Sequence, residues 1–122
     1  ECLIFPGGMP GAQHLSECEK LMTILQHHYD QERTVAAICA APALVLSHLK
    51  TNRKLRVTCY PGFEKYLDGA QVLLAPVRVV TDGNITTSRG MGTSVDLGLE
   101  IVKLLISEEK AKELAASTQY AD

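Results

Sequence analysis

The chain has 122 residues, of which 46% are hydrophobic and 21% charged, and its formal net charge is −2. This length and composition predict one globular domain over residues 1–122. The small negative charge gives no electrostatic reason to expect nucleic acid or an anionic membrane as a partner. No apolar run approaches the roughly 18 residues that a membrane-spanning helix needs.

The first predicted element is a buried strand, Cys2–Phe5, which runs into the loop Pro6-Gly7-Gly8. The glycines of this loop allow positive φ and close approach of the backbone to a ligand. A charged amino terminus directly on a buried strand is unfavourable. We therefore expect the chain to be the carboxy-terminal part of something longer, with an artificial boundary as the alternative.

A helix is predicted from about Glu17 to Tyr29, because Ser16 and Glu19 have the spacing of a capping box. His27 and His28 then fall in its last turn, where solvated histidines suit the helix dipole better than a ligand role. The next strand, Thr34–Ile38, is apolar from Val35 onward, as in a parallel strand buried on both faces.

Cys39 follows this strand directly, and a helix is predicted from about Ala41 to Leu49. A strand that turns at once into a helix leaves the sulfur at the carboxyl edge of the sheet, close to the free N–H groups of the helix. That environment favours the reactive thiolate, and the arrangement is that of a nucleophile elbow with Cys in place of Ser. An inert, buried cysteine is the alternative that the local pattern leaves open.

The other three cysteines are Cys2, Cys18 and Cys59, and the spacing of the four matches no paired zinc motif. We expect free thiols in a reducing, cytoplasmic setting, with no metal and no cofactor.

The second half of the chain predicts short strands and two further helices. Asp82-Gly83-Asn84 is typical of a hairpin turn, and Ser107 of a helix N-cap. The expected strands are Arg56–Cys59, Gln71–Leu74, Val77–Thr81 and Ile85–Thr87, and the expected helices are Phe63–Leu67, Ser94–Ile106 and Glu108–Ala116. Thr93 is the expected N-cap of the long helix, with Asp96 in its first turn.

Alternating strands and helices predict an α/β sandwich with a mostly parallel sheet. Three loops, at Gly8, Cys39 and Gly90, then meet at the carboxyl edge of that sheet, where such folds bind ligands.

The segments Pro6-Gly7-Gly8, Gly11-Ala12-Gln13, Ala36-Ala37-Ile38-Cys39-Ala40 and Thr87-Ser88-Arg89-Gly90 together resemble the DJ-1/ThiJ/PfpI superfamily, as do Leu15-Ser16-Glu17 and Gly92-Thr93-Ser94. The branch that they resemble is that of the Parkinsonism-associated deglycase and YajL. The resemblance implies a flavodoxin-like fold, of which this chain is the carboxy-terminal portion without the amino-terminal strands, and a homodimer.

The resemblance also implies roles for particular residues. Cys39 matches the oxidisable nucleophile, and the amides of Gly8 and Ala40 match the pair that forms an oxyanion pocket. Arg89 matches an arginine near the dimer-lined entrance of the site, and Gly7 and Tyr60 complete the expected substrate-binding set. The family's glutamate that hydrogen-bonds the thiol lies in strands that this chain does not include.

Two departures from related branches narrow the function. Cys59-Tyr60-Pro61 stands where one branch has His before Pro, so no histidine is assured near Cys39. Peptidase-like branches have His directly after the nucleophile, whereas Ala40 follows here, which disfavours a Cys-His-Asp peptidase.

The leading hypothesis is a glutathione-independent glyoxalase or deglycase that acts on methylglyoxal-type aldehydes or glycated side chains. The alternative is a non-enzymatic oxidative-stress sensor or redox-regulated chaperone that uses the same Cys39.

Overall fold

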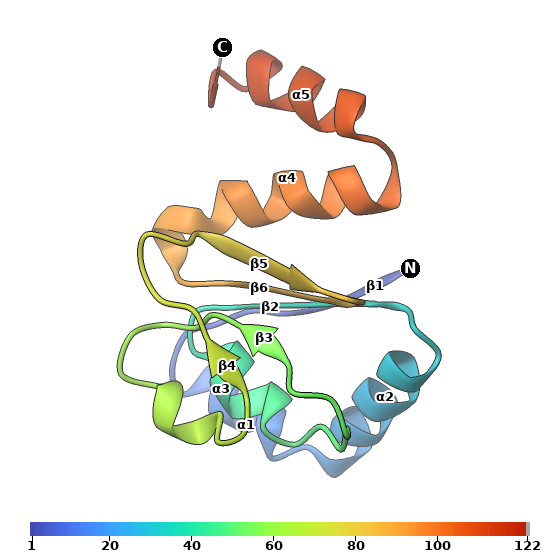
Figure 1. The fold of residues 1–122 in the computed structure, drawn as a ribbon, viewed down its shortest axis with the longest axis vertical. Helices are drawn as coiled ribbons and strands as arrows, with labels where there is room; N and C mark the ends of the chain where they lie inside the picture. Colours follow the sequence, from blue (N-terminus) through green and yellow to red (C-terminus); the bar gives the residue numbers. More distant parts are fainter. Residues whose placement is uncertain (122) are drawn as a thin grey trace.

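The computed structural model describes residues 1–121, which form a four-stranded sheet with helices on both faces (Figure 1). The strand order is β1-β2-β6-β5. Strands β1 (Cys2–Phe5), β2 (Thr34–Ile38) and β6 (Ile85–Ser88) are parallel, and β5 (Val79–Asp82) pairs antiparallel with β6. The predicted α/β sandwich with a mostly parallel sheet is confirmed, as is the hairpin at Asp82-Gly83-Asn84.

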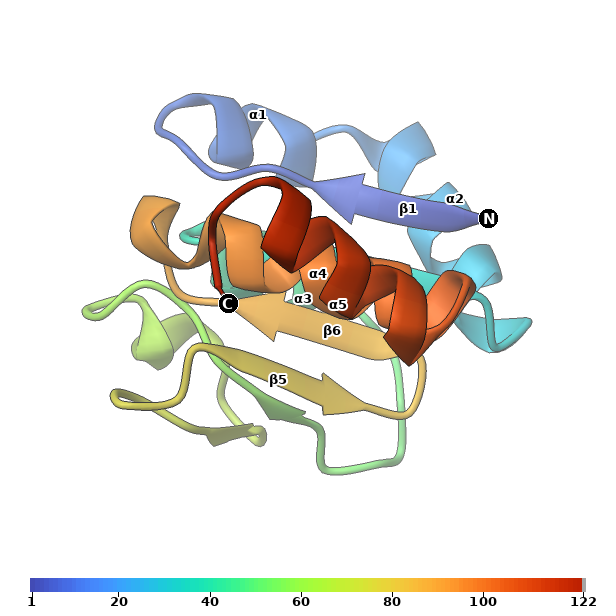
Figure 2. The same cartoon turned by 90° about the horizontal axis from the view of Figure 1, so that it is seen from above.

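One face of the sheet carries α1 (Gly11–Ser16), α2 (Glu19–Asp30) and α3 (Ala41–Leu46). The other face carries α4 (Ser94–Leu105), and α5 (Glu108–Ser117) packs on the outer side of α4. Figure 2 shows the same stack from above, with β1 along one edge and β5 along the other. Ser107 caps α5 by accepting a hydrogen bond from the amide of Lys110, as the sequence predicts.

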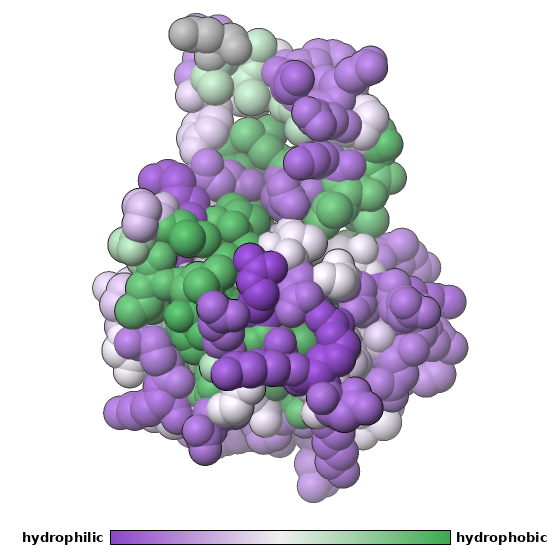
Figure 3. All heavy atoms as spheres, in the orientation of Figure 1, coloured by the Kyte–Doolittle hydropathy of each residue, from purple (hydrophilic) through white to green (hydrophobic). Residues whose placement is uncertain are grey.

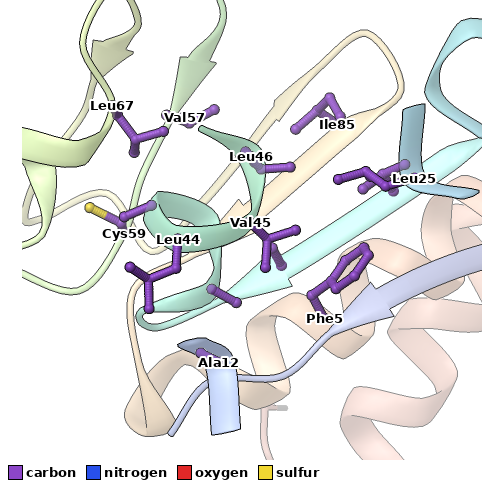
Figure 4. Close-up of a cluster of buried hydrophobic side chains, with 14 of the residues drawn as sticks. Phe5, Ala12, Leu25, Leu44, Val45, Leu46, Val57, Cys59, Leu67 and Ile85 are labelled. Atoms are coloured by element: carbon purple, nitrogen blue, oxygen red, sulfur yellow. The ribbon is translucent and has the colours of Figure 1, made fainter. Parts of the chain in front are cut away.

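The core lies between the sheet and α1–α3 (Figure 4). Phe5, Leu25, Val45 and Ile85 are at most 2% exposed and come from β1, α2, α3 and β6. Every residue of α3 is buried, and Val35, Ala36 and Ala37 of β2 are fully buried. The residues on both sides of Cys39 are therefore held by dense packing.

A second, two-stranded parallel sheet stands beside the main one. It pairs β3 (Arg56–Val57) with β4 (Gln71–Val72), and the 3₁₀ turns η1 (Glu64–Tyr66) and η2 (Met91–Thr93) complete the fold. The expected strand Arg56–Cys59 is thus shorter and lies outside the main sheet. Cys59 leaves the strand because its segment turns toward Cys39.

Two predicted helices differ from those observed. The expected helix Glu17–Tyr29 forms as α2, but it begins at Glu19, because the chain forms α1 first and breaks at Cys18, which is the N-cap of α2. The capping box does not form, since the Ser16 hydroxyl donates to the carbonyl of Gln13 inside α1. The helix after Cys39 ends at Leu46 rather than Leu49, because the next amides bond in a turn to Val45 and Leu46.

Two smaller expectations also need correction. His28 is half-buried, and its Nε2 lies 2.9 Å from the carbonyl of Thr34 instead of standing in solvent. The hydroxyl of Thr93 does not cap α4 but turns back to the loop before it.

Among residues 1–121, no helix is long and apolar enough to span a membrane. On the face drawn in Figure 3, apolar residues gather at the carboxyl end of α4, where Leu105 and Ile106 are 47% and 69% exposed.

Candidate active site

The carboxyl ends of the three parallel strands meet at one edge, as predicted. Phe5 of β1 pairs with Ala37 of β2, and Ile38 pairs with Ser88 of β6. The loops at Gly8, Cys39 and Gly90 therefore leave the sheet side by side.

Cys39 has φ +67°, a left-handed conformation that costs a non-glycine residue roughly 1–2 kcal/mol. Two backbone hydrogen bonds hold it there. Its amide donates to the carbonyl of Ser88 at 3.0 Å, and its carbonyl accepts from the amide of Tyr60 at 2.8 Å. The strained turn between β2 and α3 is the elbow that the sequence predicts, and Cys39 within it is partly exposed.

Gly7 lies directly against Cys39. A Cβ at position 7 would stand 2.5 Å from the Cβ of Cys39 and 3.3 Å from its Sγ, so only glycine fits. Gly8 has φ +93°, and its carbonyl accepts from the amide of Ala12 at 2.8 Å, which begins α1. The Pro6-Gly7-Gly8 loop is thereby fixed next to the sulfur.

The amides of Gly8 and Ala40 flank the same elbow. Within residues 1–121, no hydrogen-bond acceptor is found for either N–H group. Both amides are thus free to bind an oxyanion, and that role stays a prediction.

The four thiols differ sharply in environment. Cys59 is fully buried, and burial, with negative charge at Glu64 and Cys39, raises its pKa to about 11. Burial also raises the pKa of Cys2, although the nearby amino terminus partly opposes the shift. Cys18 is exposed at the start of α2. Cys39 alone combines partial exposure with a strained backbone.

A groove lies next to the elbow, because two of its lining residues are tied to Cys39 through the backbone. The amide of Tyr60 donates to the carbonyl of Cys39, and Arg89 follows Ser88, whose carbonyl accepts from the Cys39 amide. The groove lining includes Tyr60, Arg78, Arg89, Gly90 and Met91. The ring of Tyr60 packs near Gly90, where an added Cβ would lie 3.5 Å from Cδ1. The structure thus brings the predicted residues Tyr60 and Arg89 together beside Cys39.

Sequence reasoning missed the residues that shape this groove. Arg78 donates from Nε to Asp96 and from Nη2 to the carbonyl of Gly92, both at 2.9 Å. The hydroxyl of Tyr120 also donates to Asp96. Burial opposes ionisation of Asp96, but the hydrogen bonds from Tyr120 and Arg78 outweigh it and lower the pKa of that carboxyl.

Two buried hydroxyls, those of Ser88 and Thr93, hold the Gly90-Met91-Gly92 loop in place. The Oγ of Ser88 donates to the carbonyl of Arg78 at 2.7 Å and lies 2.5 Å from the Oγ1 of Thr93. The only sequence signal for this pair is two hydroxyl residues around a Gly-Met-Gly turn.

No group of three or more His, Cys, Asp or Glu side chains among residues 1–121 is placed to hold a metal ion.

Comparison with known proteins gives a consistent result. The model of the DJ-1/PfpI family matches residues 1–104. The Parkinson disease protein 7 homolog of Danio rerio is 37% identical over 95% of this chain and 61% of its own length. The glutathione-independent glyoxalase DJR-1.2 of Caenorhabditis elegans is 34% identical over 93% of this chain and 60% of its own length.

Solved structures agree with the observed fold. Drosophila melanogaster DJ-1beta superposes with a TM-score of 0.90 at 30% identity, over 99% of this chain and 64% of that one. Oxidized Toxoplasma gondii DJ-1 gives 0.87 at 32% identity, over 99% and 65%. The flavodoxin-like α/β fold is confirmed, and the chain spans less than two-thirds of each of these relatives.

Proposed function

The chain belongs to the DJ-1/PfpI family, and on that premise we propose that its protein is a glutathione-independent glyoxalase or deglycase with Cys39 as nucleophile. The observation that carries the proposal is the elbow, in which a partly exposed cysteine at φ +67° lies against Gly7. The relative from Caenorhabditis elegans that is named a glyoxalase supports the same reaction class.

In the proposed first step, the Cys39 thiolate attacks the aldehyde carbon of methylglyoxal. A carbon–sulfur bond forms, and the carbonyl oxygen becomes the oxyanion of a hemithioacetal. The amides of Gly8 and Ala40 stabilise that charge, because both N–H groups are free at the elbow.

A base then moves the proton from the former aldehyde carbon to the neighbouring carbon, and water releases lactate and the thiol. The family resemblance assigns this base to a glutamate outside residues 1–122, so turnover belongs to the longer protein. With a glycated side chain as substrate, the thiolate displaces the side-chain nitrogen from the former aldehyde carbon. The carbon–nitrogen bond breaks, the amine leaves with a proton, and the resulting hemithioacetal goes on to lactate by the same transfer and hydrolysis.

The test is loss of methylglyoxal without glutathione, with stereospecific detection of lactate, in the full-length protein. Cys39→Ala should abolish turnover, and Cys39→Ser should do nearly as badly because an alcohol is a far weaker acid than a thiol. Tyr60→His should be tolerated, because a related branch carries His there. Cys18→Ser is the matched control, since Cys18 is exposed and remote from the elbow, and its turnover should stay within a few-fold of the parent.

A non-enzymatic sensor is the second candidate, and the oxidized state of the Toxoplasma gondii relative favours it. In this hypothesis a peroxide oxidises the Cys39 thiolate first to sulfenate and then to sulfinate, and each step transfers one oxygen atom and releases water. A partner protein would recognise the oxidised form. If the full-length protein is oxidised at Cys39 but shows no Cys39-dependent turnover, the sensor hypothesis replaces the enzyme hypothesis.

We also propose the cytoplasm and a homodimer as the setting of this function. Both rest on the family resemblance.

A further inference from the structure

The groove beside Cys39 is lined by two arginines and by no carboxylate side chain. Arg78 has its own counter-ion, because Asp96 accepts from its Nε at 2.9 Å. Arg89 does not, since no carboxylate among residues 1–121 lies within 4.0 Å of its guanidinium. Within the part of the chain that the structure describes, the groove therefore carries one positive charge that no carboxylate pairs.

Arg89 also differs from the other arginines of the chain in burial. Arg33, Arg53, Arg56 and Arg78 are exposed, whereas Arg89 is half-buried. Its Nε donates to the carbonyl of Val77, which fixes the guanidinium at the groove. A half-buried cation without a counter-ion is unfavourable unless an anion comes to it.

The position of Arg89 relates this charge to the nucleophile. Arg89 follows Ser88, whose carbonyl accepts the Cys39 amide, and Gly90 packs on the ring of Tyr60, whose amide donates to Cys39. A small molecule bound covalently at the sulfur can thus place its far end in the groove.

We propose that Arg89 selects carbonyl compounds that carry an anionic group, a carboxylate or a phosphate, beyond the reacting aldehyde. Arg78 supports the same end of the groove but contributes less, because Asp96 already neutralises it. This inference rests on the proposed nucleophilic role of Cys39. The proposed substrates have both a reacting carbonyl and an anionic group. Methylglyoxal has the carbonyl but no anionic group.

The experiment compares two alkylating probes of similar size and different charge, iodoacetate and iodoacetamide, on the full-length protein. Peptide mapping gives the rate constants at Cys39 and at exposed Cys18, and each iodoacetate rate is divided by the iodoacetamide rate at the same thiol. This ratio removes differences in intrinsic thiol reactivity. We expect it to be about three- to tenfold higher at Cys39 than at Cys18, because one unit positive charge attracts the carboxylate of iodoacetate.

Four variants assign the preference to one side chain. Arg89→Gln keeps an N–H donor for Val77 and removes the charge, so the Cys39 ratio should fall to that of Cys18. Arg89→Lys keeps the charge and should retain most of the preference. Arg78→Gln should change it by less than about twofold. Arg53→Gln is the matched control, because Arg53 pairs with Asp82 and lines a different cavity.

Salt provides a readout that a purely structural role would not move. At 1 M ionic strength the Debye length is about 3 Å, so the preference at Cys39 should collapse while iodoacetamide labelling stays unchanged. Equal ratios at Cys39 and Cys18, or a ratio that Arg89→Gln leaves intact, would overturn the inference while the nucleophile stands. Slow labelling of Cys39 by iodoacetamide itself would contradict the proposed function, and the inference falls with it.

Discussion

Two neighbouring side chains on β1 show that the two faces of the sheet are covered to different extents. Phe5 points toward α1–α3 and is 2% exposed, whereas Ile4 points the other way and is 51% exposed. Helix α4 packs on β2, β5 and β6 (Figure 1), whereas Ile4 on β1 stays half-exposed. The Cys39 elbow is therefore supported from one side by a densely packed core, whereas the opposite face of the sheet is open at β1.

The largest expected effect separates these two faces directly. Phe5→Ala should lower the free energy of unfolding of residues 1–122 by about 3–5 kcal/mol, because it leaves a cavity in the core. Ile4→Ala on the same strand should cost less than about 1 kcal/mol. Urea denaturation followed by circular dichroism measures both, and equal losses would show that the faces are equally packed.

The same two variants, measured in a longer protein, test whether a preceding segment covers Ile4. If a preceding segment completes the sheet over β1, as the family resemblance implies, Ile4→Ala should there cost about 2–5 kcal/mol. An unchanged small cost in the longer protein would refute this completion.

The second effect concerns Cys59, whose pKa of about 11 lies above that of an unfolded thiol, about 9. The unfolded chain releases its proton first, so stability is full below pH 9 and falls as the pH rises toward 11. The loss should be on the order of 2–3 kcal/mol. Denaturation at several pH values should show this slope in the parent and in Cys18→Ser but not in Cys59→Ala, whose own stability is lower at every pH.

The third effect tests how far the dense packing reaches at the edge. Gly7→Ala should destabilise the chain by about 1–3 kcal/mol, because the new methyl group meets the Cβ of Cys39 at 2.5 Å. It should also slow alkylation of Cys39. Gly11→Ala is the control, since a Cβ there meets nothing within 4 Å, and a similar loss at both positions would argue against a tight elbow.

The smallest effect is expected at the carboxyl end of α4. Ile106→Ser should change the free energy of unfolding by no more than about 0.5 kcal/mol, because Ile106 is 69% exposed. Thermal denaturation measures this change. A fall of many degrees in the melting temperature would contradict the exposed position of Ile106.

The sequence predicted best those elements whose signal is local. β1 and β2 are short apolar runs, the hairpin follows from Asp82-Gly83-Asn84, and the elbow follows from a cysteine between a buried strand and a helix with Pro42 in its first turn. In each of these elements, the residues that determine the structure lie within a few positions of one another in the sequence.

The errors arose where a competing local bond or a contact between distant segments decides the structure. Ser16 and Glu19 have capping-box spacing, yet the Ser16 hydroxyl finds the carbonyl of Gln13, and a separate α1 results. The pairing of β3 with β4 joins two-residue strands that show no periodicity. Contacts among Arg78, Asp96 and Tyr120 join segments far apart in sequence, so the wall of the groove could not be predicted.

β1 lies at the edge of the sheet, and this position affects how the chain associates at high concentration. An edge strand exposes a row of unpaired N–H and C=O groups to any other chain. Lysine, proline or a bulge usually protects such an edge, but β1 consists of Cys2-Leu3-Ile4-Phe5. Residues 1–122 by themselves should therefore associate strand to strand, and their solubility should depend on what covers this edge.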